Sequence, residues 1–409
     1  MSNIRKQQEI LSCLYQQRLL SFELISTYLF LSKGFSESYC RKTLKAMLDD
    51  SLIRKRADIK KQCCYEITNR GVKFLREHGS IPLGSDLVKF GEEYLTPCKI
   101  KIETSSAFHQ LSLNAFVLRF ANEFQDLSFD YYDEKFCSFF PNVRPDGMLQ
   151  VGDTLYFLEM DMGTERSTRL ITKWRNYRTM LNSSFYGGIT ENIKVLFILD
   201  KASKTREKKL KKWIDDNLLD KITSRFDIVI GDTDYLIDFL SRDLSDTDFF
   251  PKEWNFFSRN ANFVSKHTDY FLYHSYLTIL EDDSIKQENG AYLEFLYDDY
   301  TFNSMYVYRK IKELSRINNM AESGTGLGRC LKYIVLVPDE KTALELLLLS
   351  DAFSLNLYFI TPKRLSLGLY QGLFQIMRDG TICHFAEHDF CIPVVENKIG
   401  NLEIKKSLS

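Results

Sequence analysis

The stretch from Arg144 to Glu165, RPDGMLQVGDTLYFLEMDMGTE, decides the fold of this 409-residue chain. Its segment TLYFLEMD is apolar and strand-like, and Ser167 begins a predicted helix, STRLITKWRNYRTML. The next segment, NIKVLFILD, is nearly all apolar, which predicts a central strand buried on both faces. Helices and strands continue to alternate through KASKTREKKLKKWIDDNL, FDIVIG and DTDYLIDFL. This alternation predicts a mixed α/β sheet, preceded by a helix over about 105–124 and a strand in LSFDYYDEKF.

Acids stand near the ends of two predicted neighbouring strands. This pattern is typical of the PD-(D/E)xK arrangement, in which carboxylates on adjacent strands hold a divalent cation. The predicted metal ligands are Asp146, Glu159 and Asp161, for Mg²⁺ or Mn²⁺ where the site is active. Asp161 stands where the arrangement has a lysine, and Lys173 on the following helix is the candidate replacement. The predicted catalytic residues are therefore Asp146, Glu159, Asp161 and Lys173.

The same acids have a structural alternative. Acids at the end of a strand often cap the next helix, and Glu165 with Arg169 makes an ordinary i,i+4 pair. His109, on the preceding helix, is a candidate to support the acids, but simple packing is the favoured role. Three acids with a displaced lysine can also bind metal without cutting. An inactive or accessory site is thus favoured over a Mg²⁺-dependent endonuclease, and enzymatic activity is left open.

The first eighty residues predict the order helix, helix, helix, strand, basic loop, strand, helix. Ile4, Leu11 and Leu14 give the first helix one apolar face, and Ser21 and Ser36 are the predicted N-caps of the next two. SLIRKRADIKKQCCYEIT reads as two short strands around a basic loop, and TNRGVKFLREHG as the closing helix.

This order, with the segments LKAMLDDSLIRKR and YEITNRGVKFL, resembles winged helix-turn-helix DNA-binding domains. The resemblance implies that the third helix enters the major groove and that the wing touches the DNA backbone. Basic side chains there bind phosphates by releasing counterions. The alternative is a protein-binding winged helix with a solvated basic loop. The expected DNA-binding residues are Ser38, Arg41, Lys42, Lys45, Arg54, Lys55, Arg56, Lys60 and Lys61.

Following such a domain, the pattern RPDG…YFLEMDMGTE…RLITKWRNY…KVLFILD resembles the replication-relaxation family over roughly 3–240. The resemblance implies a winged helix fused to a restriction-endonuclease-like domain, in proteins encoded mainly by bacterial plasmids and other mobile elements. It implies a DNA-binding accessory role in replication, mobilisation or relaxation of origin DNA, with a relaxase or replication protein as partner. Acids matched by Asp146, Glu159 and Asp161, and a lysine matched by Lys173, are typical of the family.

The predicted domains are a winged helix at 1–80, a linker at 81–104, the nuclease-like domain at 105–245 and a second α/β domain at 260–400. FLYDDYTFNSMYVYRKIKEL, from Phe295, aligns without a gap on LEMDMGTERSTRLITKWRNY. Lys310 then falls on Lys173 and Asp298 on Asp161, but Leu296 stands where Glu159 does. Two readings stay open: a degenerate repeat unable to build the same metal site, or a similarity that any two strand-helix-strand segments share.

Composition limits the remaining classes of function. The formal net charge is −1, so any DNA must be bound by local basic patches. The lysine-rich helix after Asp200 is one candidate patch, and its alternative role is an ordinary solvated face. The 9 cysteines form no CxxC pair, which argues against zinc. No secretory signal or segment of ~20 apolar residues is found, so we expect a soluble cytoplasmic protein without a membrane partner. Oligomeric state, including a homodimer, is left open, as are the alternatives of a transcriptional regulator or a protein scaffold.

Overall fold

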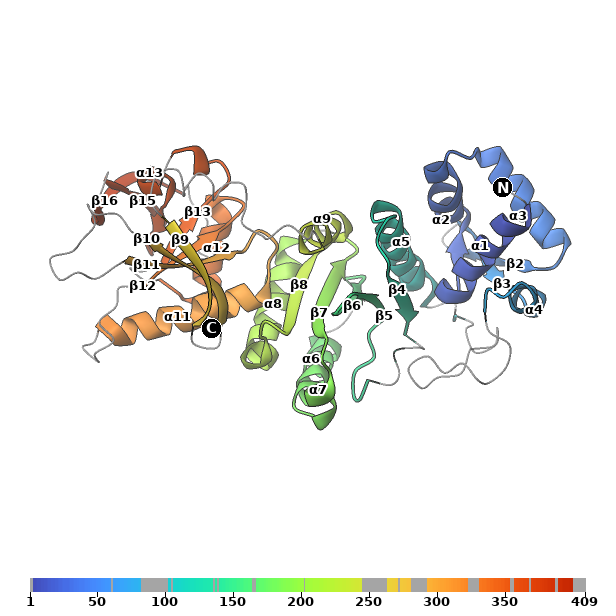
Figure 1. Ribbon diagram of the computed structural model, residues 1–409, viewed down its shortest axis with the longest axis horizontal. Helices are drawn as coiled ribbons and strands as arrows, with labels where there is room; N and C mark the ends of the chain where they lie inside the picture. The colour runs from blue at the N-terminus through green and yellow to red at the C-terminus, as the bar shows by residue number, and fades with distance from the viewer. Residues whose placement is uncertain are drawn as a thin grey trace. The chain divides into compact units, whose positions relative to one another are not determined.

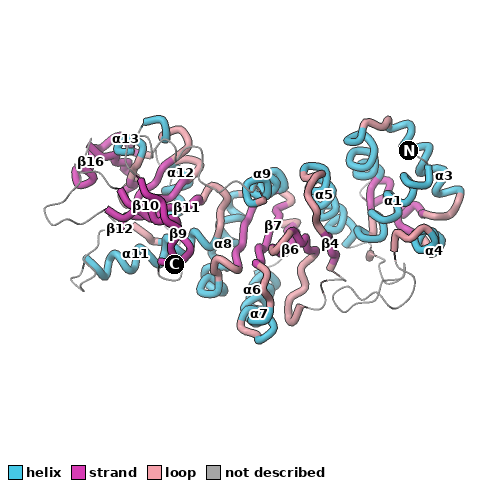
Figure 2. The backbone as a smooth tube through the Cα atoms, in the orientation of Figure 1, coloured by secondary structure: helices cyan, strands magenta, loops and turns pink. Residues whose placement is uncertain are grey.

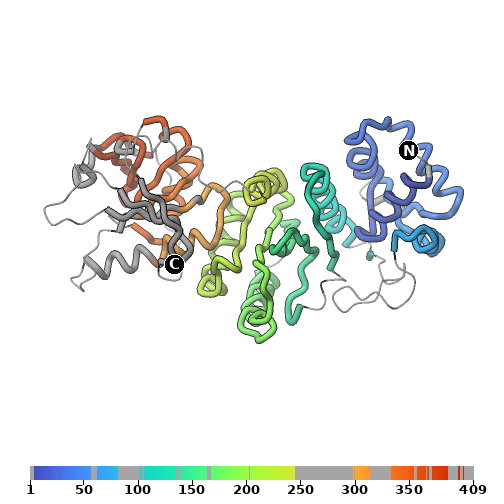
Figure 3. The backbone as a smooth tube through the Cα atoms, in the orientation of Figure 1, coloured from blue at the N-terminus to red at the C-terminus, as the bar shows by residue number. Residues whose placement is uncertain are grey.

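The structure of the protein is a computed structural model, and Figure 3 traces its backbone from the N-terminus in blue to the C-terminus in red. The chain divides into two compact units, one of 1–209 and 231–237 and one of 210–230 and 238–409. The described residues are 3–59, 62–81, 102–103, 106–134, 137, 140–163, 167–201, 203–244, 263–270, 273–280, 293–322, 331–353, 357–367, 369–386 and 389–399.

The first unit begins with a helical segment whose caps are the predicted ones. The Ser21 hydroxyl accepts a hydrogen bond from the backbone N–H of Leu24, and the Ser36 hydroxyl accepts one from that of Tyr39. The predicted apolar face of the first helix is wrong at Ile4, which lies in the first turn and is 48% exposed, because the buried apolar side chains of this helix begin only at Ile10. The elements are α1 (Asn3–Gln17), β1 (Leu20–Ser21), α2 (Phe22–Leu24), the π-helical η1 (Ile25–Phe30), the 3₁₀-helical η2 (Leu31–Lys33) and α3 (Glu37–Asp49).

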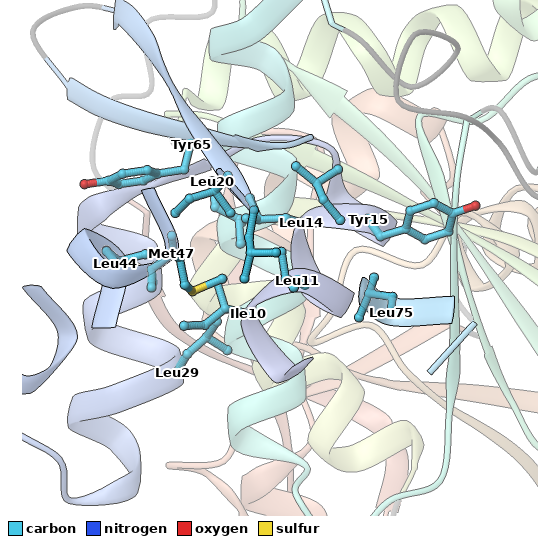
Figure 4. Close-up of a cluster of buried hydrophobic side chains, with 14 of the residues drawn as sticks. Ile10, Leu11, Leu14, Tyr15, Leu20, Leu29, Leu44, Met47, Tyr65 and Leu75 are labelled. Carbon is cyan, nitrogen blue, oxygen red and sulfur yellow. The ribbon is translucent and has the colours of Figure 1, made fainter. Parts of the chain in front are cut away.

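A small antiparallel sheet and a fourth helix complete the N-terminal elements. The strands are β2 (Ile53–Ile59) and β3 (Gln62–Ile67), in the sheet order β1-β3-β2, and α4 (Asn69–Glu77) follows. Side chains from all these elements except η2 meet in one apolar core. In Figure 4, Ile10, Leu11 and Leu14 of α1 point toward Leu44 and Met47 of α3. Burial of these side chains, each worth about 1.5–3 kcal/mol, holds the short elements together.

The rest of the first unit is the α/β core predicted from the central stretch. Antiparallel pairing joins β4 to β5 and β5 to β6, whereas β6 and β7 are parallel. Figure 1 shows these strands next to one another, and Figure 2 shows them in magenta. A mixed α/β architecture is confirmed, although the sequence did not show that 147–151 is a full strand. The bounds are α5 (Ala107–Glu123), β4 (Asp130–Asp133), β5 (Gly147–Val151), β6 (Thr154–Asp161), α6 (Ser167–Leu181), α7 (Ser184–Gly188) and β7 (Asn192–Leu199).

Three further elements follow the predicted order of helix, strand and helix. They are α8 (Lys204–Leu218), extended by the 3₁₀ turn η4 (Leu219–Lys221), β8 (Phe226–Asp232) and α9 (Thr233–Asp243). The strand order is β4-β5-β6-β7-β8, and the last two residues of β8 belong to the first unit.

Buried polar contacts join the N-terminal elements to the α/β core within the first unit. The Arg18 guanidinium lies with its Nε 2.8 Å from Oδ2 of Asp133 and donates a 2.7 Å hydrogen bond to the side-chain oxygen of Gln110. The Asn114 amide donates to the backbone carbonyls of Gln17 and Leu19. Because these groups are buried, the contacts hold the N-terminal elements in one orientation against α5 and β4.

The second unit has its own five-stranded sheet, in the order β13-β12-β11-β10-β9. Strands β9, β10 and β11 pair antiparallel, and β11, β12 and β13 pair parallel. Helices α11 and α12 connect the parallel strands. The bounds are β9 (Phe263–Tyr270), β10 (Tyr273–Leu280), β11 (Leu293–Asp299), α11 (Met305–Glu322), β12 (Leu331–Leu336), α12 (Glu340–Ser350) and β13 (Leu357–Ile360).

A small antiparallel sheet lies at the end of the second unit. The sequence had predicted an α/β domain as far as residue 400, so this sheet was not expected. Its strand order is β14-β15-β16, with irregular register between β15 and β16. The elements are the 3₁₀ turn η6 (Leu365–Leu367), α13 (Leu369–Gly372), β14 (Gln375–Ile376), β15 (Thr381–Ala386) and β16 (Asp389–Lys398). The predicted linker, 81–104, lies almost entirely outside the described residues.

Candidate functional site

The predicted acids lie at the start of β5 and the end of β6. Asp146 directly precedes β5, and the pairing of Gly147 with Leu158 places Asp146 beside Glu159. Glu159 and Asp161 are two residues apart on β6, so their side chains leave the same face of the sheet. The structure therefore places the three acids in one region of the sheet, as the spacing predicted.

Glu159 is held by two donors from α6. Its Oε2 lies 2.6 Å from Nζ of Lys173, and its Oε1 accepts a 2.6 Å hydrogen bond from the hydroxyl of Tyr177. The Glu159 side chain is only 1% exposed, so both oxygens depend on these two donors. Lys173 thus reaches the acids from the following helix, the position predicted for a displaced lysine.

Asp146 is bound by a different pair of groups. Its Oδ2 accepts a 2.8 Å hydrogen bond from the backbone N–H of Met160 and lies 3.3 Å from Nε2 of His109 on α5. Burial alone would raise the pKa of Asp146, but Lys173 and His109 outweigh it, and the pKa lies below its ordinary value. Burial lowers the pKa of His109, but the contact with Asp146 outweighs burial and raises it. His109 therefore contacts one of the acids, which is the first of its two predicted roles.

Asp161 is paired with an arginine from α8. Its two oxygens lie 2.7 Å from Nε and 3.0 Å from Nη2 of Arg206, a bidentate ion pair. Its Oδ1 also accepts a hydrogen bond from the backbone N–H of Gly163. Bidentate arginine–carboxylate pairs are among the stronger charge-assisted hydrogen bonds. The ion pair of Asp161 with Arg206 therefore joins the end of β6 to the beginning of α8.

The carboxylates are thus directed to three separate partners. A divalent cation needs free carboxylate oxygens converging on one point. Both oxygens of Glu159 and both of Asp161 are taken, and the described residues contain no group of three His, Cys, Asp or Glu side chains able to hold a metal ion. This arrangement does not fit a metal held by Asp146, Glu159 and Asp161. Metal binding by these acids stays a prediction, and it would require the ion pairs Glu159–Lys173 and Asp161–Arg206 to separate.

The acids also face different cavities. Asp146 and Asp161 line a pocket of about 1070 Å³ together with His109 and Arg206. Glu159 and Lys173 line another, of about 400 Å³. Arg169 lines both. Its predicted partner, Glu165, lies outside the described residues.

Glu159 should make the stability of the protein depend on pH. Burial raises its pKa from 4.5 to about 7, although Lys173 opposes the shift. A raised carboxyl pKa means that the folded state holds the proton more tightly than the unfolded state. The resulting stabilisation is complete below about pH 4.5 and is lost as pH rises through about 7. Glu159→Gln stays neutral at every pH. The free energy of unfolding of this variant, minus that of the wild type, should therefore be ~2 kcal/mol larger at pH 8 than at pH 5.

Urea unfolding of both proteins at several pH values between 5 and 8 measures this difference. The exposed Glu123→Gln, on α5, serves as a matched control and should show the same pH dependence as the wild type. A difference between Glu159→Gln and the wild type that does not change with pH contradicts the prediction.

The predicted DNA-contacting residues of α3 lie on one exposed face. Ser38, Arg41, Lys42 and Lys45 follow the spacing i, i+3, i+4, i+7, and all are exposed. The opposite face buries Cys40, Thr43, Leu44 and Met47 in the N-terminal core. The helix therefore presents its polar stripe to solvent because its apolar stripe is needed for folding.

The cations of α3 and β2 differ in how much of their charge is compensated. Arg41 donates to the Glu37 carboxylate and stacks over the Phe22 ring at 4.3 Å. Arg54 and Arg56 both pair with Glu66, whose side chain is 9% exposed. By contrast, Lys42, Lys45 and Lys55 are exposed, and among the described residues none of them is paired with a carboxylate. The predicted wing residues Lys60 and Lys61 lie outside the described residues.

Sequence reasoning missed two partners of the acids. Arg206 is one of seven cations between 201 and 212, and no spacing rule distinguishes it from the others. Tyr177 was part of the predicted helix, but it was not assigned to Glu159. Its position four residues after Lys173 is the signal that was available, because residues four apart share a helix face.

The fold and site define a mixed α/β protein in which buried carboxylates pair with cations. Residues 11–196 match the replication-relaxation family. The chain is similar to this family over that segment, which runs from the N-terminal elements to β7. This similarity supports a role in the replication or relaxation of mobile elements. Comparison with curated proteins and with solved structures found no match. Among the described residues, no helix is both long and apolar enough to cross a membrane.

Proposed function

We propose that the protein is a DNA-binding accessory protein of a plasmid or other mobile element, acting in replication, mobilisation or relaxation of origin DNA. Its N-terminal elements act as a winged helix in which α3 enters the major groove. The observation that carries this proposal is the exposed stripe of Ser38, Arg41, Lys42 and Lys45, on a helix whose other face is buried. Such a helix can meet a groove without disturbing the core.

The two kinds of cation have different roles in this proposal. Lys42, Lys45 and Lys55 contact phosphates and supply affinity that depends on salt. Arg41 is held by Glu37 and Phe22, so its guanidinium is oriented before DNA arrives and is suited to reading a base edge. Fluorescence anisotropy with a duplex from the native replication origin and a scrambled duplex, over a range of salt, tests the proposal. Equal affinity for both duplexes contradicts site recognition.

The nuclease-like domain, in the same proposal, contacts DNA or a partner such as a relaxase and does not cut. The support is the pairing of Glu159 with Lys173 and of Asp161 with Arg206. A cation that entered would have to displace a half-buried lysine and a bidentate arginine, and each separation would leave charges without partners. A metal-dependent endonuclease or nickase is the competing function, favoured by the convergence of Asp146, Glu159 and Lys173.

A nicking assay separates the two functions. Supercoiled plasmid carrying the native origin is incubated with the wild type and with Glu159→Ala, with and without Mn²⁺. We expect no Mn²⁺-dependent nicking by either protein, because the carboxylates are already occupied. Nicking that requires Mn²⁺ and disappears in Glu159→Ala contradicts the accessory role and supports the endonuclease.

We further propose that the second unit contains a degenerate copy of the α/β core. Both sheets join two antiparallel strand pairs to a parallel pair whose strands are connected by a helix. Lys310 lies 2.7 Å from Asp298, which also accepts a hydrogen bond from the Tyr333 hydroxyl. This triad parallels Lys173, Glu159 and Tyr177. Lys310 aligns with Lys173, but Asp298 aligns with Asp161 and not with Glu159. The copy therefore keeps a lysine–carboxylate pair, with the carboxylate two positions later along the strand.

A further inference from the structure

A pocket of about 400 Å³ is bordered by α6 and by the loop 142–144. Its lining includes three cations, Arg144, Arg169 and Lys173, and one carboxylate, Glu159. Glu159 is buried and already paired with Lys173 at 2.6 Å. Two arginines therefore remain in excess, and the pocket attracts anions.

The helical side of this pocket is built from two parallel rows. Thr168, Thr172 and Asn176 are spaced four residues apart, and so are Arg169 and Lys173. Residues four apart on a helix lie on the same face, so the two rows form one polar surface along α6. Cationic and amide groups on this surface can donate hydrogen bonds, whereas the Thr172 hydroxyl already donates to the backbone carbonyl of Thr168.

The loop on the other side is anchored. Val143 is buried, and Phe140 packs edge-on against Phe157 with ring centroids 4.7 Å apart. The Arg144 Nε–H donates a 3.3 Å hydrogen bond to the backbone carbonyl of Glu134. These contacts position Arg144 before any ligand arrives, which reduces the entropy lost on binding.

We propose that this pocket binds a phosphate group of a DNA strand. A phosphate offers only negatively charged acceptor oxygens, which match a pocket of cations and hydrogen-bond donors without a metal ion. A volume near the lower end of ligand pockets accepts the phosphate with its sugar attached. The pocket that contains Asp146 and Asp161 has several acids and is not suited to this ligand. The inference deepens the proposed function and rests on it, because it names what the nuclease-like domain contacts.

The test uses the full chain, inorganic phosphate and a short single-stranded oligonucleotide with either a 5′-phosphate or a 5′-hydroxyl. The variant is Arg144→Ala with Arg169→Ala. Arg175→Ala is the matched control, because Arg175 is exposed on the same helix and does not line the pocket. Inorganic phosphate should raise the Tm of the wild type and of the control above its value in chloride at equal ionic strength, but not that of the variant. The variant should bind an oligonucleotide about tenfold more weakly.

Each outcome of this test has one meaning. A loss confined to the 5′-phosphorylated oligonucleotide identifies a terminal phosphate as the ligand, and an equal loss with both identifies an internal phosphodiester. Unchanged oligonucleotide affinity together with unchanged stabilisation by phosphate overturns the proposal. The Tm shift should persist in Lys42→Ala with Lys45→Ala, so a failure of recognition by α3 is distinguishable from a failure of the pocket.

Discussion

Replacing Lys42 and Lys45 together by alanine is expected to weaken binding of a duplex from the native origin by about 100-fold at low salt. Both lysines are exposed on the stripe of α3, and neither is paired with a carboxylate among the described residues. Each phosphate contact releases about one counterion, so the slope of log affinity against log salt should also fall by about 2. Fluorescence anisotropy at several salt concentrations measures both quantities.

The matched control for this prediction replaces two other exposed lysines, Lys341 and Lys363 of the second unit, by alanine. It changes the net charge by the same amount and should leave both affinity and salt slope within about twofold of the wild type. If the control and the α3 variant lose affinity equally, binding follows overall charge, and α3 is not the recognition helix.

Replacing Asp133 by alanine is expected to destabilise the protein by about 3–5 kcal/mol. The Asp133 side chain is fully buried, and the Arg18 guanidinium beside it is 4% exposed. Removal of the carboxylate leaves a buried cation whose other partners are Gln110 and the half-exposed Glu134. Because the pair joins the N-terminal elements to β4, the variant should also expose the boundary between them to proteolysis. Thermal or urea unfolding measures the loss.

A double-mutant cycle with Arg18→Ala isolates the ion pair from the packing of each side chain. The double variant should be less destabilised than the sum of the single variants, since it leaves no buried charge without a partner. Asp153→Ala, in the exposed turn between β5 and β6, is the control and should change stability by less than about 0.5 kcal/mol. Strict additivity of the two single variants would show that the ion pair does not stabilise the fold.

The three carboxylates also hold helices in place. Glu159, Asp161 and Asp146 are each paired with a side chain from a helix. These contacts join α6, α8 and α5 to the end of β6 and the start of β5. Acids with this spacing can therefore orient helices.

Sequence alone determined most helices and strands of the core, because each of these depends on the local period of apolar residues. TLYFLEMD and NIKVLFILD became β6 and β7, and Ser21 and Ser36 cap the helices they were expected to cap. The sequence offered Lys173 as a candidate to meet the acids, beside an ordinary structural alternative, and the structure places it 2.6 Å from Glu159.

Only the tertiary structure decided which cation meets which carboxylate. Arg206 lies 45 residues after Asp161, and Arg18 lies far from Asp133 along the chain, so no local pattern connects them. β5 and the C-terminal antiparallel sheet were not expected either, although both are built largely from hairpins between strands that are adjacent in the chain. Local periodicity is set by neighbouring residues, whereas the partner of a buried charge is set by the path of the whole chain through space.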